Sequence, residues 1–137
     1  MANLNAANIA NMESVPVVKA NASDVHGRVR VFRDTYTAAA AAINDTITIA
    51  RLPTGAKVQD VVVHHAALGT GVILACGDSS DVDRYITAVS SATAGKKVLT
   101  AIAGFGFEQT AVTDVILTVT GAAATGLIST AVLYTLD

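Results

Sequence analysis

Three aspartates stand close together near the middle of the chain, at Asp78, Asp81 and Asp83. Clustered carboxylates are the ligands that hard cations such as Ca²⁺ prefer. The spacing departs from that of an EF-hand loop, because glycine is missing at the sixth position and glutamate at the twelfth. Arg84 follows the cluster directly and is available to pair with an aspartate. We expect a solvated or salt-bridged turn without a cofactor, and the three aspartates are only weak candidates for metal ligands.

The same turn contains the run Gly77-Asp78-Ser79-Ser80, which resembles the Gly-Asp-Ser motif of one group of lipases and esterases. In that group, a histidine late in the chain activates the serine nucleophile. The three histidines of this chain, His26, His64 and His65, all precede Ser79, and no helical pattern follows the strand-like run before it. We therefore expect no catalytic residue and no enzymatic activity.

Three further side chains, of two residue types, could do chemistry. His64 and His65 are adjacent on a strand-like run, so their side chains should point to opposite faces and cannot easily share a metal. One histidine should face the core or be hydrogen-bonded, and the other should be exposed. Cys76 ends the apolar run 72–76 without an evident cationic neighbour, which predicts a buried and unreactive thiol.

The composition limits the possible partners. Apolar residues make up 52% of the chain and charged residues 15%, against roughly 25% charged in an ordinary soluble domain. Much of the exterior must therefore be uncharged, which suits contact with other subunits. The net charge is -2 and the nine basic residues are scattered. Because nucleic-acid binding requires clustered Lys and Arg, we expect no nucleic-acid partner.

We expect neither a secretory signal in the first residues nor a membrane-spanning helix over 115–136. The first residues lack the basic and apolar regions of a secretory signal, which predicts that the protein is made and kept in a cytoplasm. The segment 115–136 carries no charge and is long enough to cross a bilayer as a helix. Its two glycines, its many Ser and Thr residues and its β-branched positions instead favour two buried strands joined by a turn.

Short β-type runs follow one another from Val15 onward, with turn residues between them. Alternation is clearest over 46–49 and 115–120, where one face is aliphatic and the other is largely threonine. The run Ala38 to Ala42 has helical propensity but is too short for a helix, so we expect a loop or one helical turn. The expected strands are Val15 to Lys19, Arg28 to Tyr36, Thr46 to Leu52, Lys57 to His65, Val72 to Cys76, Tyr85 to Val89, Lys97 to Ala101, Phe105 to Glu108, Val115 to Thr120 and Leu127 to Leu136.

This pattern predicts an all-β fold, a two-sheet antiparallel sandwich of jelly-roll type with an N-terminal arm. An immunoglobulin-like sandwich is the alternative, but its usual markers are missing because the chain has no Trp and a single Cys. Residues 15–137 form one β-sandwich domain in this interpretation. Residues 1–14, rich in Asn and Ala, form an arm or a short helix.

Four segments together resemble a family of small virion proteins of tailed bacteriophages, and most of all the capsid cement, or decoration, proteins. They are Arg51 to Lys57, Gly69 to Leu74, Gly77 to Tyr85 and Val115 to Gly121. The resemblance implies a jelly-roll-like structural protein without catalysis. It also implies a place on the outside of the mature capsid, as a dimer or trimer bridging major capsid protein subunits.

The arm lies outside the part that carries this resemblance, and we expect it to add contacts that the compact domain cannot reach. The expected capsid contacts are Asn3, Leu4, Asn5, Asn8, Ile9 and Met12. A phage tail or head-tail joining protein is the first alternative, because it would share the composition. A small hydrolase or metal-binding protein and a bacterial surface or pilus subunit are the others.

Overall fold

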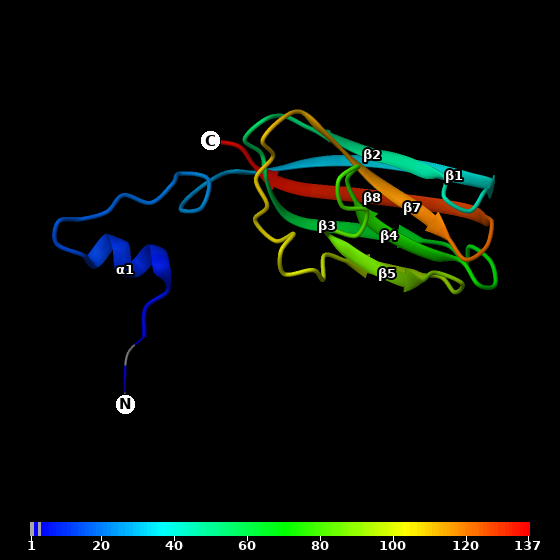
Figure 1. Cartoon of the computed structure of the whole chain (residues 1–137), viewed down its shortest axis with the longest axis horizontal. Helices are drawn as coiled ribbons and strands as arrows, with labels where there is room; N and C mark the ends of the chain where they lie inside the picture. Colours follow the sequence, from blue (N-terminus) through cyan, green and yellow to red (C-terminus); the bar gives the residue numbers. More distant parts are fainter. Residues whose placement is uncertain (1, 3) are drawn as a thin grey trace.

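The computed structural model describes residues 2 and 4–137, and strands dominate it (Figure 1). One helix precedes them. The elements are α1 (Ala7–Glu13), β1 (Val29–Ala41), β2 (Thr46–Leu52), β3 (Lys57–His65), β4 (Ile73–Gly77), β5 (Ile86–Ser90), β6 (Gly95–Val98), β7 (Thr113–Thr120) and β8 (Ala124–Thr135).

The strands form two antiparallel sheets of four strands each, in the orders β1-β8-β3-β6 and β2-β7-β4-β5. Consecutive strands of the chain mostly cross from one sheet to the other, and the first and last strands are neighbours in one sheet. This eight-stranded, two-sheet connectivity is that of a jelly roll. The predicted fold class is confirmed.

The core lies between the inner faces of the two sheets. On β7, Val115, Leu117 and Val119 are buried, while the residues between them are only partly buried. This is the alternation expected of a strand with one buried face. The inner faces of β3 and β8 supply aliphatic side chains in the same way, among them Val61 and Val132. The segment 115–136 thus forms two strands, as predicted. No helix in the described chain is long and apolar enough to cross a membrane.

The run Ala38 to Ala42 corrects one prediction, because most of it continues β1 rather than forming a loop or a helical turn. Ala38 pairs with Gly126 and Ala41 with Ala124, and the register shifts between the two pairs. Within the irregularity, Ala40 has φ 54 and donates its backbone N–H to the Oγ1 atom of Thr125. Pairing with β8 provides hydrogen-bond partners for the backbone of this run. This stabilisation outweighs the intrinsic helical propensity of a run that is too short for a helix.

Three predicted strands also differ. The segment 15–19 is not a strand and belongs to neither sheet of the described chain, and Pro16 has no backbone N–H to donate. The segment 105–108 makes only a single bridge, between Lys57 and Glu108, because Gly106 adopts φ 74 and turns the chain. Strand β6 begins and ends earlier than the predicted strand at 97–101.

Candidate functional site: the N-terminal arm and its anchor

The N-terminal arm extends from one end of the sandwich and lies apart from it (Figure 1). Its helix α1 has no buried residue. Three of the predicted contact residues are apolar and exposed, at 87% for Leu4, 46% for Ile9 and 45% for Met12. Asn5 is exposed and Asn8 is half-buried, whereas Asn3 lies outside the described residues. The arm therefore presents apolar side chains that the sandwich does not cover.

The contacts of the described part of the arm are internal. The Nδ2 atom of Asn5 donates to the Oε2 atom of Glu13 at 2.6 Å. The Ser14 hydroxyl donates to the backbone carbonyl of Asn11 at 2.6 Å, and the backbone N–H of Val18 donates to the same carbonyl at 3.0 Å. Short-range bonds of this kind give the arm a local shape and leave its apolar side chains available.

Sequence reasoning missed the second apolar part of the arm, because it assigned these residues to a strand. Val15, Val17 and Val18 are all exposed, at 98%, 64% and 51%. The available signal was Pro16, which argues against a strand paired on both sides. With Leu4, Ile9 and Met12, these valines form the apolar arm, the name used below for these six residues.

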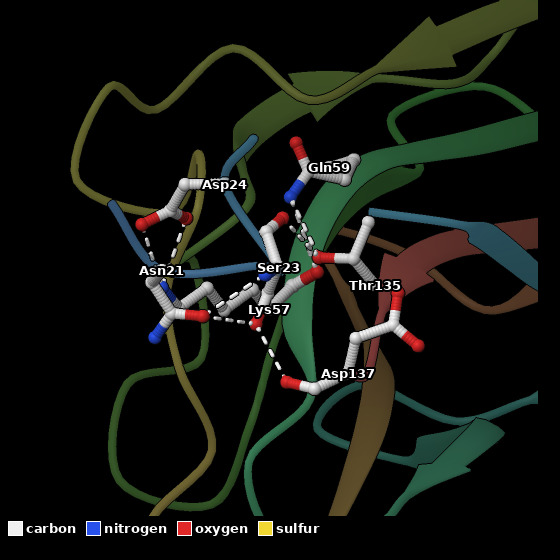
Figure 2. Close-up of polar contacts among 7 residues, drawn as sticks. All are labelled: Asn21, Ser23, Asp24, Lys57, Gln59, Thr135 and Asp137. Carbon is white, nitrogen blue, oxygen red and sulfur yellow. Dashed lines mark hydrogen bonds and ion pairs between the residues drawn. The ribbon is translucent and has the colours of Figure 1, made fainter. Parts of the chain in front are cut away.

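The arm is fixed to the sandwich by a polar cluster just after it, which we call the anchor (Figure 2). The Nζ atom of Lys57 lies 2.9 Å from each carboxylate oxygen of Asp24. The Oγ1 atom of Thr135 donates to the backbone carbonyl of Ser23 at 3.1 Å. The Ser23 hydroxyl lies 2.8 Å from the Oδ1 atom of Asn21 and 3.2 Å from the Asp137 carbonyl. The anchor thus joins the base of the arm to β3 and to the end of β8.

Asp137, two residues beyond β8, completes this attachment. A carboxylate oxygen of Asp137 accepts the backbone N–H of Arg28 at 2.9 Å, and its partner oxygen lies 3.5 Å from the Arg28 guanidinium. The backbone hydrogen bond from Arg28, together with the positive charges of Arg28 and Arg30, holds the pKa of Asp137 below its usual range. Arg28, the residue before β1, is therefore held by Asp137.

The aspartate cluster resolves into an ion pair and two exposed carboxylates. The Arg84 Nε atom donates to Asp78 at 2.6 Å, as the sequence predicted, and the Arg84 guanidinium lies 4.0 Å from the ring centroid of Phe107. Burial by itself raises the pKa of Asp78, but Arg84 and the N–H groups of Asp81 and Ser80 outweigh it and leave that pKa below its usual value. Within the described residues, no three His, Cys, Asp or Glu side chains converge on one point.

A hollow of about 820 Å³ opens beside this ion pair, over the outer face of β2 and β7. Ser79 lines it, but no histidine does. Arg51, which also lines the hollow, is paired with Asp114 at 2.6 Å, and this contact lowers the pKa of Asp114. The charged groups that line the hollow are thus paired with one another and leave no serine–histidine couple.

The remaining candidate residues are separated by the fold. His65 is buried, with its Nδ1 atom 2.9 Å from the Ala66 carbonyl oxygen, while His64 is exposed, so the predicted division between the two histidines is confirmed. Cys76 is buried in the core, as predicted, and burial raises its pKa to about 12. A thiol with such a pKa is almost entirely protonated at neutral pH and is a poor nucleophile.

This chain resembles known proteins in its fold. Neither a protein-family model nor a curated protein sequence matches it. By fold, a chain of the cyanophage Pam1 capsid asymmetric unit matches with a TM-score of 0.70 and 29% sequence identity, over 81% of this chain and 86% of that chain. This likeness includes the sequence as well as the fold.

Two more solved structures share the fold at lower identity. A chain of the capsid of Ralstonia phage GP4 matches with a TM-score of 0.67 and 21% identity, over 81% of this chain and 86% of that chain. A chain of the acidic stable capsid structure of Helicobacter pylori bacteriophage KHP30 matches with a TM-score of 0.59 and 16% identity, over 79% and 87%. All three of these structural neighbours are chains of phage capsids.

Proposed function

We propose that this chain is a structural protein of a bacteriophage virion that binds the outside of the capsid and cements, or decorates, the shell of major capsid protein. The observation that carries the proposal is the likeness to a chain of the cyanophage Pam1 capsid asymmetric unit, at 29% identity and a TM-score of 0.70. Two observations on the described residues support a structural role without catalysis. Ser79 shares its hollow with no histidine, and the Cys76 thiol is buried.

The apolar arm is the proposed contact with the shell. Leu4, Ile9 and Met12 would leave water on docking, and burial of apolar surface stabilises a contact by about 25 cal/mol per Å². Their polar neighbours, Asn3, Asn5 and Asn8, are the proposed donors and acceptors to the shell. Such a contact is modest for one copy, but a homo-oligomer that engages several subunits at once binds far more firmly.

The anchor supports this role because it limits where the arm can go. Asn21 to Arg28 is attached to the sandwich through Lys57, Thr135 and Asp137, so the apolar arm starts from a fixed point. A segment that is tethered at a fixed point searches a smaller volume than a free peptide, which raises its effective concentration at a nearby surface.

The experiment is co-sedimentation of the purified chain with undecorated capsids. We expect the intact protein to pellet with capsids in many copies per shell. The double variant Ile9→Asn, Met12→Gln removes apolar contact from the arm and should bind at least tenfold more weakly, since each lost side chain is worth about 1 kcal/mol or more.

A matched control is Ile102→Asn, which removes an equally apolar side chain that is 92% exposed on a loop of the sandwich. This variant should pellet like the intact protein. Failure of the intact protein to bind capsids would contradict the proposed function. Equal binding by the arm variant and the control would remove only the role of the arm.

A further inference from the structure

Strand β1 leaves one side of its backbone unpaired along the edge of the sandwich. It pairs in register with β8 from Val29 to Ala38 without interruption. The other three edge strands are shorter or irregular. Strand β6 has four residues, two of them lysines, β5 pairs irregularly with β4, and the β2 register shifts between Thr48 and Ala50. Short strands, bulges and charged side chains are features that discourage edge pairing. The stretch 29–38 of β1 is long and without a bulge, and its charges are those of Arg30, Arg33 and Asp34.

The hydrogen-bonding pattern of β8 with its two neighbours shows which backbone groups of β1 point outward. The Leu127 carbonyl accepts from Ala66, so the odd-numbered residues of β8 bond towards β3 and the even-numbered ones towards β1. Thr130 lies opposite Asp34, so the even-numbered residues of β1 bond to β8. The odd-numbered residues 29, 31, 33 and 35 therefore direct N–H and C=O groups outward. The outward N–H of Thr35 is occupied by the carboxylate of Asp34, at 2.8 Å.

The side chains of the strand make it complementary to itself. A twofold axis perpendicular to the sheet brings two copies of β1 together antiparallel, and it places opposite each other only residues on the same face. Centring the axis on Arg30, Arg33 or Asp34 sets like charges in contact, which is unfavourable. Centring it on Phe32 instead places Arg30 of each copy opposite Asp34 of the other.

We propose that two copies of this chain pair through β1, antiparallel and centred on Phe32, to form one continuous sheet of eight strands. In this register Val31 lies opposite Arg33, and their outward backbone groups bond to each other. Arg30 can take part, because the polar contacts that its side chain makes with other described residues are long, at 3.5 Å to the Leu136 carbonyl and 3.9 Å to Asp137. The exposed Val29 and Val31, at 60% and 55%, become partly covered by the side chains opposite them in the second copy.

The test is sedimentation of the free full-length protein, without capsids, at concentrations from about 1 to 100 μM. The wild-type chain should associate reversibly as a dimer. Arg30→Glu and Asp34→Arg each convert both cross-strand pairs to like charges, so each variant should raise the dissociation constant by roughly tenfold or more. The double variant Arg30→Glu, Asp34→Arg restores opposite charges and should return the constant to within about threefold of wild type.

Arg33→Glu is the matched control, because it changes the net charge as Arg30→Glu does but lies opposite Val31 rather than a charge. It should change dimerisation much less than Arg30→Glu does. The far-UV spectrum of each variant checks that the sandwich is retained. A monomeric wild type, equal effects of Arg30→Glu and Arg33→Glu, or a double variant as weak as the single ones would each overturn the proposal. Capsid binding is measured separately, by co-sedimentation, so failure of dimerisation is distinguished from failure of the proposed function.

Discussion

The ammonium of Lys57 binds both carboxylate oxygens of Asp24 across 33 positions of sequence. The Lys57 side chain is only 10% exposed, so water solvates its charge poorly and Asp24 is its main source of electrostatic stabilisation. The pair attaches the base of the arm to β3. Loss of the carboxylate would leave a nearly buried cation without its counter-charge, which is more costly than loss of an exposed ion pair.

Asp24→Asn should therefore lower the free energy of unfolding by about 1 to 3 kcal/mol, as measured by urea denaturation. It should also make the chain between residues 14 and 28 easier to cleave with protease, because the anchor loses its strongest contact. Glu108→Gln is the control, since Glu108 is exposed and a substitution there should change stability by less than about 0.5 kcal/mol. Equal stability of the two variants would show that the pair of Asp24 with Lys57 contributes nothing to stability.

A second prediction concerns pH. Arg84 and the backbone N–H groups hold the pKa of Asp78 in the folded chain below its usual value, which is about 3.9 for an unfolded chain. Because the pKa of Asp78 is lower in the folded chain than in the unfolded chain, the ionised carboxylate stabilises the fold at pH values above the unfolded pKa. This stabilisation is lost as the pH falls through the folded pKa. The Asp78→Asn variant lacks this titration. The difference in unfolding free energy between wild type and Asp78→Asn should be constant from pH 7 to 5 and shrink below about pH 4. A difference that stays constant down to pH 2.5 would contradict the ion pair.

Cys76 gives a third prediction, about reactivity. The thiol is buried and its pKa is raised to about 12, so the folded protein should react with a disulfide reagent such as DTNB at least 100-fold more slowly than the protein in 8 M urea. Absorbance of the released thiolate follows both rates. Fast reaction without denaturant would mean that the core around β4 opens readily.

A fourth prediction is that the serine of the Gly-Asp-Ser run has no role in function. Ser79→Ala should leave capsid binding and the unfolding free energy unchanged, the latter within about 0.5 kcal/mol, because Ser79 is exposed and no histidine lines the same hollow. The measurement is capsid co-sedimentation beside urea denaturation. Loss of capsid binding at full stability would reveal a role for this residue that its surroundings do not suggest.

The fold could be predicted from the sequence where apolar and polar residues alternate along a strand, because this alternation shows which face of the strand is buried. Val115, Leu117 and Val119 show the pattern, and all three are buried. The ion pair of Asp78 with Arg84 could also be predicted, because the two residues are only six positions apart in the sequence. Both inferences depend on local spacing, which a sequence displays directly.

The anchor could not be predicted in the same way. Thr135 meets Ser23 across 112 positions, and Lys57 meets Asp24 across 33, so the contacts exist only after the sandwich has closed. Intrinsic propensity was misleading at Ala38 to Ala42, where pairing with β8 outweighs the helical preference of alanine. The valines at 15, 17 and 18 have strand propensity but no partner strand, and propensity alone does not reveal that absence.

The position of the protein in the native particle can be determined by a reconstruction of purified virions at a resolution that shows β-sheets. If the chain decorates the capsid, eight-stranded sandwiches should stand on the outer surface in many symmetry-related copies, each with density from its N-terminal arm running into the shell. Sandwich density at a tail or at the head-tail connector, with a bare outer capsid surface, would contradict the proposed function.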